Sequence, residues 1–178
     1  MSRTYYCDKR CCEIKIVDYT SMNVYRRRRG YSIKAGVFVY DPEKEAVLLV
    51  QSRGYLWGCP KGSLEVDKNE TALECAIREM KEETGIDVSA EDFTKSTNIK
   101  NRAIYYYTEM KSGFVNVQCQ TDNDANGICW IKLSCLEECI NSGMISLNQH
   151  ARVVFKKFID RTFPKVDFKR VESRSRKN

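Results

Sequence analysis

One amphipathic, glutamate-rich helix constrains this fold more than any other segment. Asp67 or Asn69 can cap a helix that runs to about Thr84, and Gly85 is expected to end it. Apolar residues recur at helical spacing along it, at Leu73, Ala76, Ile77 and Met80. One face must therefore be buried against other structure.

The segments around this helix are predicted to be mainly β-strands. Runs rich in β-formers occupy Tyr31–Tyr40, Ala46–Gln51, Arg102–Thr108, Phe114–Cys119 and Gly127–Ile131, with one more at Glu13–Val17. The glycine-containing stretch Arg53–Asp67 is expected to be a loop. Two helices are expected near Cys135–Asn141 and Asn148–Asp160. Strands with one internal helix and closing helices predict an α/β layered sandwich.

Three carboxylates crowd one sector of the central helix. Glu79, Glu82 and Glu83 are related by three and four positions, so their charges repel unless a cation neutralises them. Hard oxygen ligands of this kind suit Mg²⁺ or Mn²⁺ bridging to phosphates. The alternative is a solvated acidic face with Lys81 as its partner.

The spelling around these glutamates decides between the two. From Glu70 to Ile86 the chain reads E-x7-R-E-M-K-E-E-T-G-I, which resembles the Nudix box. The resemblance implies an α/β fold: an αβα sandwich with a mixed central sheet, one catalytic loop-helix and closing C-terminal helices. It assigns 28–163 to the Nudix hydrolase domain, 1–27 to a basic cysteine-containing segment and 164–178 to a basic, disordered tail. One departure stands out, since Gly62 and Glu70 are separated by seven residues where the box has five.

Roles follow from the resemblance. Metal ligands would be Glu79, Glu82 and Glu83, with the backbone at Gly62 passing close to the metal, which would be Mg²⁺ or Mn²⁺. Arg78 would hold the carboxylates and Glu70 would support it. Family members often take a general base from outside the box, before a strand that contains tryptophan. Asp124, six positions before Trp130, is the predicted base or extra ligand, with Glu82 as the alternative base and an Asx-rich turn as the structural alternative.

Two branches of the family compete for the substrate. Trp57–Gly62 reads W-G-C-P-K-G and resembles the mRNA-decapping branch, where Lys61 would contact a phosphate. The Pro-Lys-Gly of this element is shared with dinucleoside-polyphosphate hydrolases, whereas Arg28, Arg29, Lys34 and His150 resemble the diphosphoinositol-polyphosphate phosphohydrolases. Candidates to stack on a base are Tyr55, Trp57, Tyr105, Tyr106 and Tyr107, and of these Trp57 and Tyr106 are predicted to bind substrate. A Nudix fold reduced to an RNA-binding module would have lost box glutamates, whereas all of them stand here.

Charge favours a polyanionic partner. The net charge is +6, and basic residues gather at Arg26–Arg29 and in the tail Lys165–Asn178. We expect RNA or a nucleotide or polyphosphate substrate, and no membrane partner because no apolar run reaches the length of a span.

The number of cysteines gives an expectation for the cellular compartment. Nine cysteines without a secretory signal predict reduced thiols in the cytoplasm, with the nucleus as the alternative. A zinc site is the other interpretation of Cys7, Cys11 and Cys12, but no C-x2-C pair accompanies them.

Overall fold

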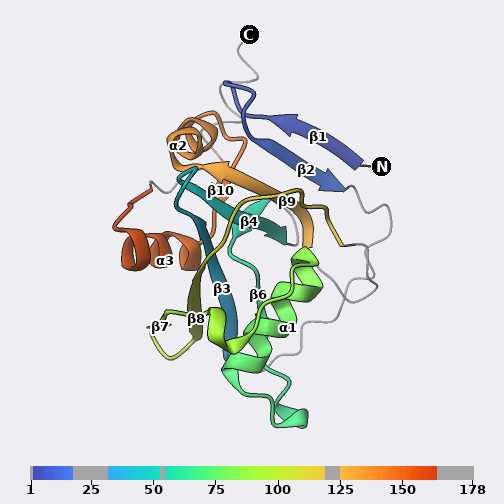
Figure 1. Cartoon of the computed structure of the whole chain (residues 1–178), viewed down its shortest axis with the longest axis vertical. Coiled ribbons are helices and arrows are strands. Elements are labelled where there is room, and N and C mark those ends of the chain that lie inside the picture. Colours follow the sequence, from blue (N-terminus) through green and yellow to red (C-terminus); the bar gives the residue numbers. More distant parts are fainter. Residues whose placement is uncertain (1, 18–31, 53–54, 119–124, 164–178) are drawn as a thin grey trace.

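A mixed β-sheet forms the centre of the molecule in the computed structural model, which describes residues 2–17, 32–52, 55–118 and 125–163 (Figure 1). Its main path runs β1-β2-β9-β4-β3-β8-β7. These strands are β1 Ser2–Tyr6, β2 Glu13–Val17, β3 Lys34–Asp41, β4 Ala46–Ser52, β7 Lys95–Ile99, β8 Ala103–Glu109 and β9 Ala125–Lys132. The β3–β8 pair is parallel and the other neighbours along this path are antiparallel.

Three short strands attach to this path. They are β5 Leu56–Gly58, β6 Lys61–Ser63 and β10 Ser146–Leu147. β6 pairs with β3, while β5 pairs with β4 and with β10. The stretch expected as a loop at Arg53–Asp67 therefore contains two strands, and β6 brings its backbone alongside β3.

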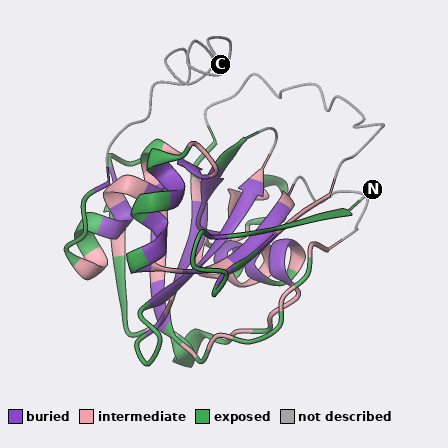
Figure 2. Cartoon of the chain, turned by 90° about the horizontal axis from the view of Figure 1, so that it is seen from above, coloured by how far each residue is buried: buried purple, intermediate pink, exposed green. Residues whose placement is uncertain are grey.

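Helices cover both faces of the sheet. α1 Ala72–Thr84 packs on one face, and α2 Leu133–Asn141 and α3 Gln149–Ile159 pack on the other (Figure 1). Short 3-10 turns lie at Val66–Lys68 and Ala90–Asp92. Figure 2 shows the buried residues along the strands and the inner sides of the helices. The predicted αβα sandwich is confirmed.

Alternation along the strands builds the two cores. In β3, Val37 and Val39 pack with α1, whereas Phe38 points to the other face and meets Phe155 of α3 edge-on at 5.2 Å between ring centroids. This is the alternation expected of a sheet buried on both faces.

The ends of α1 are fixed by local chemistry. Thr71, and neither Asp67 nor Asn69 as expected, is the N-cap, and it forms a capping box with Glu74. Gly85 ends the helix as predicted, in the left-handed region at φ 75°. The buried face includes Ala76 and Met80, but Leu73 and Ile77 are only half-buried.

Several strand predictions need correction. The described part of Phe114–Cys119 is not a strand, and Phe114 is 83% exposed. The Lys15 ammonium group donates a hydrogen bond to the Val115 carbonyl in this segment at 2.9 Å. β1 and β7 were not predicted. None of the helices in the described ranges is long and apolar enough to cross a membrane.

Candidate active site

Arg78 is the centre of a network of carboxylates on α1. Its Nε donates to Glu70 at 2.6 Å, and its Nη1 donates to Glu79 at 2.8 Å and to Glu82 at 2.9 Å. These hydrogen bonds, first of all that with Glu70, raise the pKa of Arg78 above its ordinary value. The guanidinium thus offsets part of the repulsion between the carboxylates and fixes where they stand.

Glu83 is the buried member of the group, with 2% of its surface exposed. Its Oε2 accepts the backbone N–H of Lys61 at 2.8 Å, and its Oε1 lies 3.5 Å from the Ser52 hydroxyl. Side-chain exposure rises to 13% at Glu79 and 41% at Glu82. The three carboxylates therefore form a series from the interior to the surface.

Gly62 makes room for this arrangement. A Cβ added at this position would lie 1.7 Å from Glu79 Oε1, much closer than any side chain could tolerate. The Glu79 carboxylate thus lies directly against the β6 backbone, in the space that any other residue would fill. Sequence position 62 was expected to pass close to the metal site, and the structure brings it against a predicted ligand.

Although the loop before α1 is two residues longer than in the Nudix box, it places Glu70 within hydrogen-bonding distance of Arg78. Glu70 Oε2 accepts the backbone N–H of Glu65 at 2.8 Å and also a bond from Arg78 Nη2 at 3.1 Å. The Arg78 hydrogen bond, followed by that of Glu65, holds the pKa of Glu70 below its ordinary value of 4.5 despite burial. The longer loop contains the 3-10 turn Val66–Lys68.

The W-G-C-P-K-G element is explained mostly by packing. Trp57 has no exposed surface and belongs to the core beneath α3, so its ring presents no face to a base. The structure does not support Trp57 as a substrate contact. A Cβ at Gly58 would lie 2.1 Å from the Asn148 side chain, which caps α3. The Pro60 carbonyl accepts the Val37 N–H at 3.0 Å, which attaches the element to β3.

Cationic side chains gather on the α3 face of the sheet. A Cβ at Gly36 would touch both Lys61 Cβ and the Tyr105 ring, which places Lys61 on the face occupied by Tyr105. The Tyr105 hydroxyl lies 3.3 Å from His150 Nδ1. Burial, and then the charges of Lys61, Lys34 and Arg102, lowers the pKa of His150 below its ordinary value of 6.5.

Ser63 contacts both Arg78, at the centre of the carboxylate network, and the cationic side chain of Lys34. It was not predicted as a site residue from the sequence. Its carbonyl accepts Arg78 Nη2 at 3.2 Å, and its hydroxyl accepts Lys34 Nζ at 3.2 Å. Its place beside Gly62 was the available signal. Arg102 was also missed, because only the parallel β3–β8 pairing brings it near Lys34.

The aromatic candidates are mostly core residues. Tyr105 and Tyr107 are buried on the α3 face, and Tyr106 is half-buried on the α1 face, where its ring packs on Phe93 at 5.2 Å between centroids. Tyr106 is therefore on the opposite side of the sheet from Lys61. Tyr55 is 58% exposed.

Three of the predicted residues, Arg28, Arg29 and Asp124, lie outside the described residues, and their roles stay predictions.

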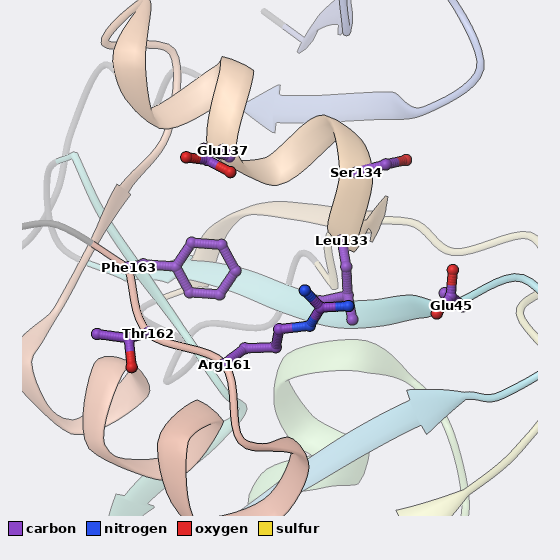
Figure 3. A pocket seen from close by; sticks show the side chains of 7 residues that line it. All are labelled: Glu45, Leu133, Ser134, Glu137, Arg161, Thr162 and Phe163. Atoms are coloured by element: carbon purple, nitrogen blue, oxygen red, sulfur yellow. The ribbon is translucent and has the colours of Figure 1, made fainter.

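A separate cavity does not involve the carboxylates. It measures about 220 Å³ and is lined by Glu45, three residues of α2 and Arg161–Phe163 (Figure 3). None of the predicted site residues lines it. The candidate active site is instead the surface where α1 meets β6.

A family model for the NUDIX domain matches residues 30–150. The chain belongs to the Nudix family. Protein 111R of Invertebrate iridescent virus 3, which is named as a hydrolase, is 33% identical over 136 residues, covering 74% of this chain and 79% of that protein. This Nudix chain is also 34% identical over 106 residues to the m7GpppN-mRNA hydrolase dcap-2 of Caenorhabditis elegans, but it spans only 13% of that protein and the match covers 55% of this chain.

Solved structures of other proteins share the fold. The dihydroneopterin triphosphate pyrophosphohydrolase of E. coli superposes with a TM-score of 0.52 at 19% identity, over 72% of this chain and 97% of the other. A bifunctional NMN adenylyltransferase/ADP ribose pyrophosphatase from Francisella tularensis, complexed with AMP and a Mn ion, gives 0.52 at 21% identity, over 76% of this chain and 43% of the other. At these identities the likeness concerns the fold alone.

Proposed function

We propose that this Nudix hydrolase cleaves a phosphoanhydride bond with a divalent cation, Mg²⁺ or Mn²⁺, held by Glu79, Glu82 and Glu83. The observation that carries the proposal is the gathering of these carboxylates by Arg78 against the glycine backbone of β6. Their oxygen donors suit hard divalent cations. When bound, such a cation polarises a phosphoryl oxygen and lowers the pKa of bound water.

The chain's own residues supply positioning and charge. Arg78 fixes Glu79 and Glu82, and the Lys61 N–H fixes Glu83, so little reorganisation is needed when substrate binds. Lys61 and Lys34 offer positive charge to phosphate oxygens from the other side of β6. Asp124, or Glu82 in its place, would take the proton from the attacking water.

The substrate that we favour is the 5′ cap of mRNA, cleaved to release a cap nucleoside diphosphate, or a dinucleoside polyphosphate of similar chemistry. The support is the 34% identity with dcap-2 over 106 residues, together with the resemblance of the W-G-C-P-K-G element that precedes the box to the mRNA-decapping branch. The basic segment Arg26–Arg29, which includes the predicted substrate contacts Arg28 and Arg29, would follow the RNA through phosphate contacts. With such a substrate, we expect the protein to act in the cytoplasm or the nucleus.

One observation favours a second candidate, a diphosphoinositol polyphosphate. Lys34, Lys61 and Arg102 all act on His150, so several cations lie within electrostatic range of one point. A heavily phosphorylated ring requires such a concentration of positive charge. An mRNA cap would require fewer phosphate contacts beside His150 and more contacts along the RNA chain.

Product analysis separates these candidates. Capped RNA labelled in the cap phosphate is incubated with Mg²⁺ and then with Mn²⁺, and a diphosphoinositol polyphosphate is run in parallel. The double variant Glu82→Gln/Glu83→Gln is the control, because glutamine keeps the shape and an acceptor for the Lys61 N–H while removing the charge. Circular dichroism and the melting temperature check that it folds.

Release of a labelled cap nucleoside diphosphate by the wild type, abolished in the folded double variant, is the expected result. Turnover of the inositol compound without cap release would transfer the function to the second candidate. Full turnover by the double variant would refute the metal-site assignment itself.

A further inference from the structure

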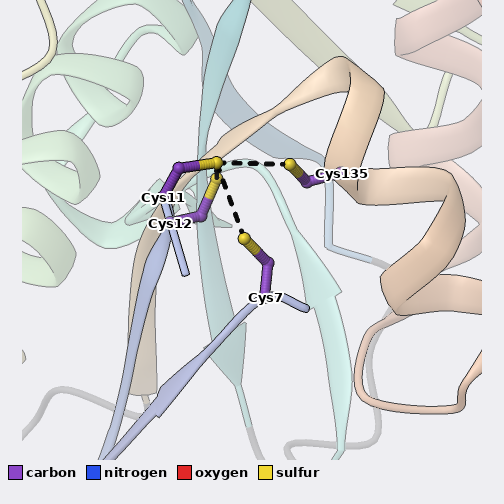
Figure 4. Close-up of side chains that lie close together, drawn as sticks. All are labelled: Cys7, Cys11, Cys12 and Cys135. Carbon is purple, nitrogen blue, oxygen red and sulfur yellow. Dashed lines mark hydrogen bonds between the residues drawn. The ribbon is translucent and has the colours of Figure 1, made fainter. Parts of the chain in front are cut away.

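Four cysteines from distant parts of the chain meet beside the sheet. Cys7, Cys11 and Cys12 come from the turn between β1 and β2, and Cys135 comes from the first turn of α2 (Figure 4). Their sulfur atoms all lie within 4.8 Å of one another. Cys7, Cys12 and Cys135 are buried, while Cys11 is exposed.

The spacing of the sulfur atoms fits one tetrahedral metal ion. Cys11 Sγ lies 3.7 Å from Cys7 Sγ, 3.8 Å from Cys12 Sγ and 3.5 Å from Cys135 Sγ. A Zn–S bond of about 2.3 Å in a tetrahedron separates neighbouring sulfurs by about 3.8 Å. A disulfide would require about 2.0 Å. We propose that Cys7, Cys11, Cys12 and Cys135 bind one structural zinc ion.

The backbone holds the ligands in this arrangement. The Cys7 carbonyl accepts the Arg10 N–H at 2.7 Å, and the Cys7 N–H donates to the Cys12 carbonyl at 3.1 Å, which closes the turn. Arg10 takes a left-handed conformation at φ 52°. The three ligands of the hairpin are thus presented on one short turn, as in a zinc knuckle.

Neighbouring groups support a negatively charged thiolate cluster. The Lys132 N–H donates to Cys12 Sγ at 3.3 Å, as outer-shell donors do at metal sites. Cys135 stands at the third residue of α2, near the positive end of the helix dipole. Lys9 and Glu138 form an ion pair at 3.3 Å that links the same turn to α2.

Ligand chemistry favours a soft metal such as the proposed zinc over hard cations. All four donors are soft sulfurs, which suit zinc and iron and not magnesium or calcium. Four closed thiolate ligands leave no position for water, so the site is structural and not catalytic. A zinc ion bound here would link the N-terminal hairpin to α2. Helix α3 covers the same face of the sheet as α2.

The sequence argued against a zinc site because the usual paired spacing of cysteines is missing. In the folded chain the fourth cysteine comes from a distant segment. No C-x2-C pair exists and only three cysteines cluster in the sequence, whereas the fourth ligand is 124 positions away from Cys11. Cys7 and Cys11 are separated by three residues, which is within the two to four that zinc ligand pairs use.

Metal content of the purified full chain tests the proposal. Zinc is measured by mass spectrometry for the wild type, for Cys11→Ala and Cys135→Ala, and for the control Cys139→Ala. Cys11 is exposed, so its substitution removes a ligand with little loss of packing. Cys139 is buried one turn further along α2 and outside the cluster, which makes it the matched control.

We expect one zinc per chain in the wild type and in Cys139→Ala, and its loss from Cys11→Ala and Cys135→Ala in the presence of a chelator that leaves the wild type loaded. Replacement by Co²⁺ should give the visible absorption of a tetrahedral thiolate site. Zinc removal should lower the melting temperature of the wild type but not of Cys11→Ala. Equal zinc in all variants, a metal-free wild type that takes up neither ion, bound iron, or a Cys7–Cys11 disulfide would overturn the proposal.

Discussion

Replacing Gly62 with alanine tests the contact that defines the acidic site. The new Cβ would lie 1.7 Å from Glu79 Oε1 and 1.9 Å from Glu79 Cδ, so the carboxylate must rotate away. Gly62 is not among the residues with positive φ, and alanine therefore introduces no backbone strain. The effect comes from Glu79 alone.

The cost can be estimated from the bonds that Glu79 would lose. Its hydrogen bond with Arg78 measures 2.8 Å, and a bond to a charged group contributes about 1.5–3 kcal/mol when buried. Because Glu79 is 13% exposed, water replaces part of this, and we expect a loss of about 1 kcal/mol in unfolding free energy. A misplaced ligand should weaken divalent-cation affinity by at least the factor of about 10–100 that outer-shell changes produce.

The assay is titration with Mn²⁺, followed by the electron paramagnetic resonance signal of the free ion, together with thermal unfolding. Gly113→Ala is the matched control, because a Cβ there meets nothing within 4 Å. We expect Gly62→Ala to lose Mn²⁺ affinity and turnover with a small fall in melting temperature, while Gly113→Ala behaves as wild type. Equal Mn²⁺ affinity in the two variants would refute the reasoning that Gly62 exists to admit Glu79.

Three further predictions concern the pKa of His150, the pKa of Glu70 and the glycine that ends helix α1. His150 is the only histidine, so its ring signal in NMR reports one pKa; Lys61→Gln should raise that pKa toward 6.5, and an unchanged value would show that the two are not coupled. The lowered pKa of Glu70 means that its stabilisation is complete above 4.5 and is lost as pH falls through the folded-state value. Glu70→Gln should therefore lower stability at neutral pH and flatten its decline in acid, as urea unfolding at several pH values would show. Gly85→Ala forces a side chain into φ 75° against Gln118 and should cost about 1 kcal/mol or more in thermal unfolding, without altering Mn²⁺ affinity.

Local pattern was enough to predict the central helix and the grouping of its carboxylates. The spacing of Glu79, Glu82 and Glu83 is a property of consecutive residues on one helix, and Gly85 marks the end of that helix by its own conformational freedom. Strands β3 and β4 were predicted near their observed bounds because each is a local run of β-forming, largely apolar residues.

Features that depend on distant contacts were not predictable from one sequence. Trp57 was expected to bind a base, but whether an aromatic ring is exposed depends on which helix covers it, and here α3 does. The fourth thiol of the cysteine cluster and the cations around His150 also come together only through the pairing of strands far apart in the chain. Strand β1 has five exposed residues and lacks the alternation that would have revealed it.

The N-terminal hairpin also determines where the sheet ends. β2 pairs with β9 from Ile14 opposite Cys129 to Ile16 opposite Gly127, so the central apolar strand has partners on both sides. Without residues 2–17, β9 would present unpaired backbone groups along an apolar edge, which is a template for self-association. The polar, exposed β1 takes that outer position instead. Protection from aggregation would then depend on how firmly the hairpin is held to the rest of the fold.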